Sequence, residues 1–460
     1  MPKNKIQKFV LLVLSLVSLE IQGQESLTLN QFMTIVKTFH PTVRQSRLQN
    51  QITQNQILAA KGQLDPKLSA KAGEKNIGGV GYYRQQSLNI ELPTWYGLNL
   101  IGEVKNLEGQ KLDLSDTKGT LQQIGVEIPL AKGLLFDQRR ASIQQARLFA
   151  QMTENEQNLL INDLLLKASQ AYIEWWKSHQ ILTINRNGYQ NNKQRLKMIQ
   201  KTYELGERPA IDTVEAAAQM QLFELKVNEA ETHFKNATLQ LSVFLWDDHT
   251  RMVMLPSHIV PEDLSETPSP ESEHSLPILA NHNALLYYRN KQDFLQVEKK
   301  LKFQSLLPKL DLVYHFIRKD QWQFFPVFRE NFQYGIKLEI PIFLRTERAH
   351  YENAKLKLLQ NELDLALKQN ELDAKLQQYR NEQENYHRQE GLAQKNILLY
   401  EQLLRGEHLR FLNGDGSVFL INARETKLLE TKEKLTEIQA KQWENHYKLQ
   451  WIRNELISTL

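Results

Sequence analysis

The chain has 460 residues, of which 41% are hydrophobic and 24% are charged, and its formal net charge is +4. Apart from the extreme N-terminus, no segment approaches the roughly 18 consecutive apolar residues that a membrane-spanning helix requires. Cysteine is absent, which excludes a disulfide scaffold, a cysteine-ligated zinc site and a thiol nucleophile. This absence also suits an oxidising compartment.

Residues 1–23 have the layout of a secretory signal peptide. Three lysines precede the apolar segment 9–19, FVLLVLSLVSL, and a polar stretch follows it. We expect cleavage near Gly23; the alternative is a buried N-terminal helix. Cleavage would remove the three lysines and Glu20 and lower the formal charge from +4 to +2. The nearly neutral mature chain gives no indication of nucleic-acid binding.

Two segments, 66–129 and 308–341, carry alternating polar and apolar residues typical of strands of about ten residues. The alternating stretches are LSAKAG, SLNIEL, LNLIGEV and IGVEIPL in the first segment, and PKLDLVYHFIR and FQYGIKLEIP in the second. Nearby aromatic residues are Tyr82, Tyr83, Trp95, Tyr96, Trp322, Phe324, Phe325, Phe328 and Phe332. The pattern fits either a soluble β-sandwich or the wall of an outer-membrane barrel with an aromatic girdle.

Two proline-free segments predict very long helices. Proline is absent between Lys132 and Arg208 and from Phe343 to the C-terminus, and proline is strongly disfavoured inside helices. At 1.5 Å per residue, a helix over 136–203 would be about 100 Å long. In the second segment a heptad stripe indicates coiled-coil packing. Its members are Leu358, Leu365, Leu372, Tyr379, Tyr386, Ala393 and Tyr400, which we interpret as a packed or half-buried seam.

The two halves of the chain repeat three landmarks in the same order. DPKL at 65–68 matches LPKL at 307–310, VEIPL at 126–130 matches LEIPI at 338–342, and LGE at 205–207 matches NGD at 413–415. We therefore predict a first repeat over 24–246, a linker over 247–277 that is rich in Pro, Ser, Glu and Asp, and a second repeat over 278–460. Each repeat comprises a helix, strands and a long helical hairpin with its tip near 206 or 414. The prolines at the strand–helix junctions are Pro66, Pro129, Pro308 and Pro341.

These features together resemble the TolC-like outer-membrane efflux proteins of Gram-negative bacteria. The resemblance is carried by SLTLNQFMTIVKTFHPTV at 26–43, the two Glu-Ile-Pro junctions, YELGERPAIDTVEAAAQ at 203–219 and RFLNGDGSVFLINARE at 410–425. It implies a mainly α-helical homotrimer in which each chain gives four strands to a 12-stranded outer-membrane barrel. The helices would continue the barrel as a coiled-coil tunnel in the periplasm. The resemblance also implies a passive exit duct for efflux or secretion, which docks a periplasmic adaptor protein and works with an inner-membrane pump.

Physical reasoning independently requires more than one copy of such a chain. Four strands cannot close a barrel, and an open sheet edge in lipid leaves backbone groups without hydrogen bonds. Because bacterial barrels have eight or more strands, three copies of four strands would give twelve.

The tip segments supply candidate docking residues. Gly414 and Gly416 allow the chain to reverse, and Asp415 or Ser417 can cap the returning helix. Gly206 is expected to do the same in the first half. The candidate adaptor-docking residues are Gly206, Glu207, Gly414 and Asp415.

A charged ring near the tips would gate a symmetric tunnel. The resemblance implies acidic residues six and nine positions after the second turn glycine, but Leu420 and Ala423 occupy those positions. Asp212 and Glu215 stand at the matching positions of the first half. The candidate gate residues are Asp212, Glu215, Asn422 and Arg424; the alternative for each is a solvated helix face or a cap.

No motif indicates catalysis or a resident cofactor. His40, His179, His233, His315 and His387 are scattered, and NGDGS fails as a calcium loop because Val418 and Arg424 occupy its sixth and twelfth positions. Neither a Gly-x-Ser-x-Gly elbow nor a P-loop is present. We expect no enzymatic activity, no metal and no cofactor. The alternatives to a channel are a periplasmic adaptor and a secreted coiled-coil scaffold.

Overall fold

The computed structural model describes residues 26–112, 117–268, 281–319 and 331–457. The predicted signal peptide lies outside them, as do Trp322, Phe324, Phe325 and Phe328. The chain folds as two compact units. Of the described residues, the helical unit comprises 26–44, 161–268 and 375–457, and the sheet unit comprises 45–112, 117–160, 281–319 and 331–374. Each unit takes segments from both predicted repeats, so the division at 24–246, 247–277 and 278–460 remains a prediction.

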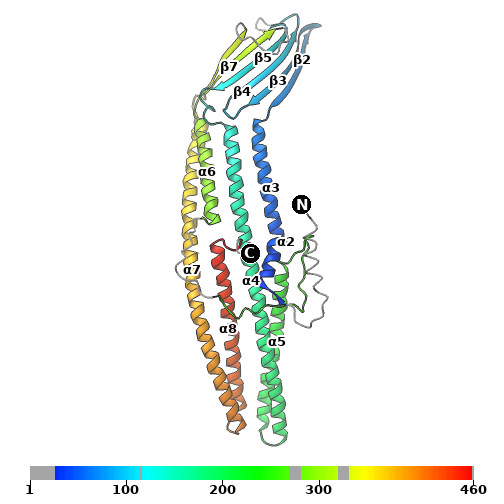
Figure 1. Ribbon diagram of the computed structural model, residues 1–460, viewed down its shortest axis with the longest axis vertical. Coiled ribbons are helices and arrows are strands. Elements are labelled where there is room, and N and C mark those ends of the chain that lie inside the picture. Colours follow the sequence, from blue (N-terminus) through cyan, green and yellow to red (C-terminus); the bar gives the residue numbers. More distant parts are fainter. Residues whose placement is uncertain (1–25, 113–116, 269–280, 320–330, 458–460) are drawn as a thin grey trace. The chain divides into compact units, whose positions relative to one another are not determined.

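The described residues of the sheet unit form one antiparallel sheet of six strands in the order β2-β3-β4-β5-β7-β8 (Figure 1). The strands are β2 (Lys67–Ile77), β3 (Val80–Pro93), β4 (Asn99–Glu108), β5 (Gly119–Pro129), β7 (Lys309–Lys319) and β8 (Phe332–Glu339). The expectation of four strands per chain, which came from the family resemblance, is therefore wrong. All six alternating stretches of the sequence form strands, because each can present an apolar face and pair with its neighbour.

The register places even-numbered residues of all six strands on one face, here called the even face, and odd-numbered residues on the odd face. Leu88 lies opposite Val104, Leu100 opposite Val126, and Ile124 opposite Phe316. The parity holds because side chains alternate along a strand and each pair of strands is aligned even to even. A bulge between Lys75 and Asn76 shifts it at the far end of β2.

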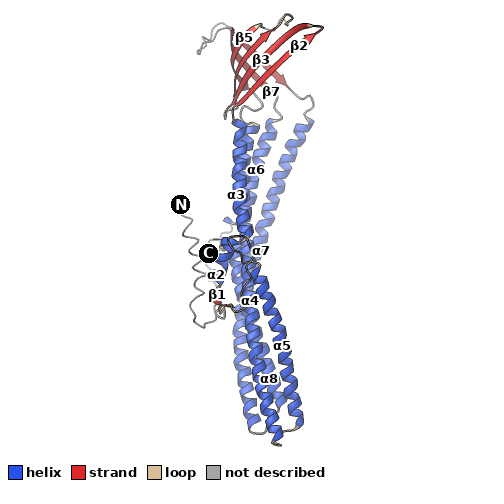
Figure 2. Ribbon diagram, turned by 90° about the vertical axis from the view of Figure 1, so that its right-hand side faces the viewer, coloured by secondary structure: helices blue, strands red, loops and turns tan. Residues whose placement is uncertain are grey.

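Four helices join the sheet at one end (Figure 2). They are α3 (Pro41–Lys61), α4 (Gln138–Glu204), α6 (Asn283–Gln304) and α7 (Arg345–Leu412). The predicted very long helices are confirmed, since α4 has 67 residues and α7 has 68. All seven predicted heptad residues of α7 are buried or half-buried, as expected of a packed seam.

The helical unit packs the distal parts of α4 and α7 with α5 (Ala210–Ser242), α8 (Val418–Ile452) and α2 (Leu29–Phe39). Its core is aromatic: Tyr172, Trp175 and Trp176 are buried with Phe32 of α2. Part of the predicted linker belongs to this unit. The strand β6 (Val260–Pro261) pairs with β1 (Ser26–Leu27), and Trp443 Nε1 donates to the Leu264 carbonyl oxygen at 2.9 Å.

None of the described helices is both long and apolar enough to cross a membrane.

Candidate functional site

The even face of the sheet is apolar and exposed. Leu88 and Leu100 lie on it, with Ile124 at 59% and Ile336 at 65% exposure. Their neighbours on this face are Leu68, Ala70, Leu92, Val104, Val126, Ile128, Leu310, Leu312 and Leu338. A β-sandwich would bury such a face under a second layer. In the described part of the chain Leu68, Ala70, Leu88, Leu92, Leu100, Ile124, Ile336 and Leu338 are exposed and the others of this set are half-buried, so the face suits an apolar medium rather than water.

Four aromatic rings gather on the even face at the far end of β7 and β8. The centroids of Tyr314 and Phe316 are 4.7 Å apart, and those of Tyr314 and Phe332 are 6.0 Å apart. Tyr334 stacks beside Phe332 at 6.2 Å. Aromatic rings mark the level of a membrane–water interface in outer-membrane barrels. Of the predicted aromatic residues, Phe332 belongs to this group, whereas Tyr83 is on the odd face and Trp95 and Tyr96 lie in the connection between β3 and β4.

The odd face carries charged side chains, and three apolar residues, Leu107, Leu121 and Val313, lie buried on it. Lys337 Nζ lies 3.5 Å from Glu127 Oε1, and Lys309 Nζ lies 3.6 Å from Asp311 Oδ2. Arg139, at the start of α4, donates to Asn99 Oδ1 at 2.8 Å. One face thus offers charge and hydrogen bonds while the other is apolar, as in a wall between water and lipid. The strand lengths of 8 to 14 residues fit the roughly 9–11 residues that cross a bilayer in a tilted strand.

The sheet is open at both edges. In the described residues β2 has only β3 as a neighbour and β8 has only β7. Every residue of β2 is exposed, and so are seven of the eight residues of β8. An edge of this length presents unpaired backbone groups and templates pairing with another chain. One copy is therefore an incomplete wall.

The four junction prolines stand where strands begin and end. Pro66 and Pro308 directly precede β2 and β7, whereas Pro129 is the last residue of β5 and Pro341 lies two residues after β8. Each position lies at the edge of the hydrogen-bonded ladder, where the missing N–H of proline costs little.

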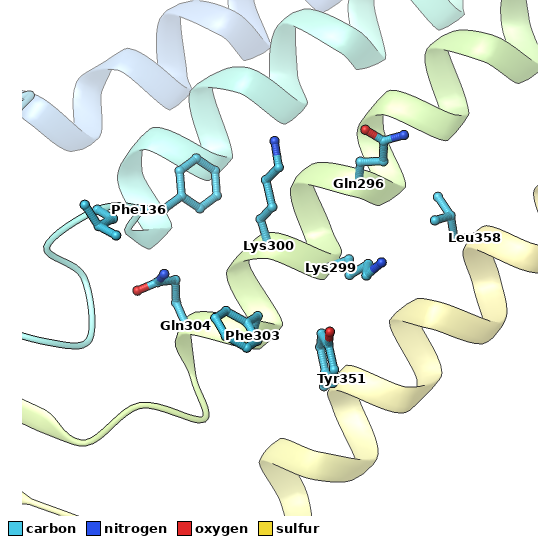
Figure 3. Close-up of a pocket in the computed structure, with 9 residues that line it drawn as sticks. Phe136, Gln296, Lys299, Lys300, Phe303, Gln304, Tyr351 and Leu358 are labelled. Carbon is cyan, nitrogen blue, oxygen red and sulfur yellow. The ribbon is translucent and has the colours of Figure 1, made fainter.

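A groove of about 520 Å³ lies between the start of α4, α6 and α7 within the sheet unit (Figure 3). Phe136 precedes α4, Lys300 and Phe303 come from α6, and Tyr351 comes from α7. The rings of Phe303 and Tyr351 lie 5.8 Å apart. The lining holds neither a carboxylate nor a histidine. No cluster of three or more potential metal ligands occurs in the described ranges.

The two helical hairpins turn through the same backbone motif. Gly206 has φ +76° and Gly414 has φ +88°, a conformation that only glycine adopts at little cost. At the first tip the Gly206 N–H donates to the Tyr203 carbonyl and the Glu207 N–H donates to that of Thr202. At the second tip the Gly414 N–H donates to the Phe411 carbonyl and the Asp415 N–H donates to that of Arg410. Both turns are Schellman motifs, in which Glu207 and Asp415 occupy equivalent positions.

The second tip continues with two residues of distinct roles. A Cβ on Gly416 would lie 2.4 Å from the Phe411 backbone nitrogen, so glycine is needed there for close approach. Ser417 is the N-cap of α8, since its hydroxyl accepts from the Phe419 N–H at 3.2 Å. Of the two caps considered from the sequence, Ser417 rather than Asp415 has this position.

A buried polar network lies behind the tips and contains two of the candidate gate residues. Asn422 Nδ2 donates to Glu215 Oε1 at 3.2 Å, which links α8 to α5. Arg195 of α4 donates to Asn422 Oδ1 at 3.0 Å and to Glu425 Oε2 at 2.6 Å. The Arg195 and Glu425 side chains are only 8% and 5% exposed. Asn192 adds a hydrogen bond to Glu425 at 3.0 Å, so the network ties three helices together.

The other two candidate gate residues lie outside this network. Asp212 Oδ2 is 4.0 Å from Arg208 NH1, one helical turn away on the same segment. Arg424 is half-buried on α8. On α7, burial and the positive charge of Arg195 lower the pKa of His408, whereas Glu425 acts in the opposite direction. The direction of this shift favours the neutral form of His408, whereas Arg195 carries the positive charge that meets Glu425.

Sequence reasoning missed Arg195 and Arg208. Arg208 joins the two tips: its guanidinium donates to the Phe411 carbonyl at 2.8 Å and to the Gly416 carbonyl at 3.2 Å. It also lies 4.1 Å from the centre of the Phe411 ring. A usable signal existed for Arg195, because with Asn192 and Ile199 it follows the three- and four-residue spacing of a buried helix stripe. Arg208 carried no comparable signal.

No protein-family model matches the chain, and no curated protein matches it. Solved structures do match its fold. Crystal structures of CusC, described in terms of folding and transmembrane channel formation, align with a TM-score of 0.68 at 13% identity over 95% of both chains. The open-state outer membrane channel MtrE of Neisseria gonorrhoeae gives 0.67 at 13% identity over 93% of this chain and 89% of that one. The Campylobacter jejuni outer membrane channel CmeC gives 0.65 at 12% identity over 93% and 85%.

Proposed function

We propose that this chain, whose fold is that of the TolC-like outer-membrane channels, is one subunit of a homotrimeric exit channel for efflux or secretion. The observation that carries the proposal is the single-layered sheet with an exposed apolar face, a polar face and two open edges. In lipid, each unpaired backbone group costs several kcal/mol, so only a closed wall is stable there. Copies of the chain must join edge to edge to provide it.

The different chemistry of the two faces indicates which one contacts lipid and which one contacts water. The even face turns its leucines, isoleucines and aromatic rings to the lipid of the outer membrane, and the odd face lines a water-filled bore. The long helices extend the bore into the periplasm. No step of this function requires catalysis or a cofactor, because the channel offers a passive path.

The helical tips are proposed to dock a periplasmic adaptor protein, which connects the channel to an inner-membrane pump. Support comes from the matching motifs around Gly206 and Gly414, which present Glu207 and Asp415 at equivalent places. Arg208 donates a hydrogen bond to the second turn, and the network around Arg195 links α4 to α8 behind the tips. We propose that these contacts also hold the tips closed as a gate.

The alternatives are a periplasmic adaptor and a secreted coiled-coil scaffold. Both would expose the even face to water, whereas soluble proteins rarely leave a large contiguous apolar patch uncovered. The channel is therefore preferred.

The proposal is tested on full-length protein expressed in a Gram-negative host. We expect it in the outer-membrane fraction as a detergent-extracted trimer that dissociates only on heating and forms ion-conducting pores in planar bilayers. A monomer that is soluble without detergent and does not conduct would overturn the proposal.

Replacement of the tip glycines tests the docking role. Valine at Gly206 and Gly414 must adopt a left-handed conformation, which costs about 1–2 kcal/mol per residue. A Cβ meets no atom within 4 Å at either position, so the effect is backbone strain rather than a clash. We expect intact trimers with reduced export in an assay with the native adaptor and pump. Gly406→Ala, within α7 and also in open space, is the control and should leave export unchanged. Normal export by the valine variants would contradict the docking role.

A further inference from the structure

We infer that β8 of one copy pairs with β2 of the next in a register set by the β5–β7 pairing inside each chain, so that three copies enclose an 18-stranded wall. The inference rests on the proposed function, and the partner is a second copy of this chain. It follows from the six strands of each sheet and from the internal repeat.

The repeat makes two pairs of strands equivalent. β5 carries Glu127-Ile128-Pro129, and β8 ends at Glu339, which Ile340 and Pro341 follow. β2 and β7 each begin directly after the proline of the matching Pro-Lys-Leu sequences. β5 therefore corresponds to β8, and β2 corresponds to β7.

The two halves differ in the number of strands between these landmarks. In the second half β7 pairs directly with β8, whereas in the first half β3 and β4 lie between β2 and β5. The first half thus contributes four strands and the second half two. Because six is even, β8 of one copy runs antiparallel to β2 of the next, and the wall closes without a mismatch.

The β5–β7 pairing already joins the last strand of one repeat to the first strand of the next. In it, Glu127 lies opposite Val313. The Leu130 N–H donates to the Leu310 carbonyl at 2.7 Å, which continues the ladder past Pro129. Carried over to equivalent residues, this register places Glu339 opposite Lys71 of the next copy. The Ile342 N–H then faces the Leu68 carbonyl.

The transferred register satisfies the chemistry of both faces. Even residues meet even residues, which keeps the apolar face continuous; a slip by one residue would invert it. On the odd face the carboxylate of Glu339 meets the ammonium group of Lys71. On the even face Ile342, which is 89% exposed in one chain, meets Leu68, which is 70% exposed. In this register Glu339 and Ile342 therefore each meet a suitable partner on the β2 edge of the next copy.

Six strands per chain also increase the diameter of the wall. With strands about 4.8 Å apart and tilted by about 45°, 18 strands give a wall roughly 39 Å across between backbones, against roughly 26 Å for twelve. The wider wall would admit a larger cargo through the membrane-spanning part.

Disulfide scanning tests the register, and the cysteine-free chain gives no background. Glu339→Cys is combined in turn with cysteine at Lys67, Ser69, Lys71, Gly73 or Lys75, and membranes are oxidised with copper phenanthroline. The odd pairs of the template are non-hydrogen-bonded pairs, with Cα atoms about 4.5 Å apart, which suits a disulfide. We expect the highest yield at Lys71→Cys and a ladder of linked chains that ends at three. The control pair Glu127→Cys with Val313→Cys should close within one chain and yield no ladder.

Strongest linkage at another β2 position, or a ladder ending at two chains, would overturn the inference while wild-type conductance still upholds the channel. Failure of the channel itself would appear separately, as wild-type protein that neither trimerises nor conducts. Electron cryomicroscopy of the wild-type trimer keeps the inference testable if the variants misassemble: a ring about 39 Å across supports it, and one of about 26 Å contradicts it.

Discussion

Ile124→Arg is expected to destabilise the assembled channel by about 2–4 kcal/mol, the cost of an arginine on the lipid face near the middle of a bilayer. Ile124 lies on the even face, flanked by Gly102 and Phe316. The neighbouring Gln123 points to the odd face, opposite Glu103, where an arginine gains a partner. Gln123→Arg is therefore expected to change the stability little.

The two variants are compared by urea unfolding in lipid vesicles and by the yield of heat-dissociable trimers in outer membranes. Because Ile124 is 59% exposed in one chain, a water-exposed sheet would tolerate arginine there within about 0.5 kcal/mol. Equal stability of both variants would therefore contradict the assignment of the even face to lipid.

Arg195→Met is expected to destabilise the tip region by about 3–5 kcal/mol, because it leaves the buried carboxylate of Glu425 without its charged partner. Glu425→Leu should lower the stability by a similar amount, since it leaves the buried guanidinium of Arg195 without its carboxylate partner. The double variant removes both charges and replaces them with apolar groups of similar size. We expect it to recover most of the lost stability, because apolar replacements of buried ion pairs are often neutral.

Hydrogen exchange of the distal parts of α4 and α8 measures these effects where they occur, and thermal unfolding reports the global result. Arg388→Met serves as the control, because its partner Glu384 is 77% exposed and the pair lies in water. Its removal should have little effect. Additive losses in the double variant would show that Arg195 and Glu425 act independently.

Local physical chemistry determined the long helices and their turns. The absence of proline predicts α4 to within a few residues and, together with the turn at Gly414, the extent of α7, whose heptad stripe is buried or half-buried as its spacing requires. Gly206 and Gly414 marked the reversals, because a left-handed residue is needed to end a helix in this way. These features depend on residues close in the chain and could be predicted from it.

For the number of strands, the alternation of polar and apolar residues was a better guide than the family resemblance. Alternation in the sequence marked six stretches, and all six are strands, whereas the family resemblance implied four. The surplus pair, β3 and β4, lies inside the first half and leaves the landmarks at both ends unchanged. A resemblance carried by those landmarks could therefore not count the strands between them.

Tertiary structure alone decided the contacts behind the tips. The sequence placed Glu215 and Asn422 on separate helices as candidate gate residues, but their mutual hydrogen bond and its link to Arg195 join segments more than 200 residues apart. Arg208 reaches the Phe411 carbonyl across a similar separation. Helix periodicity fixes which side of a helix a residue occupies, whereas the partner on that side depends on how the helices pack. The sequence therefore determined the helices, the turns and the faces of the strands, and packing decided which charges meet.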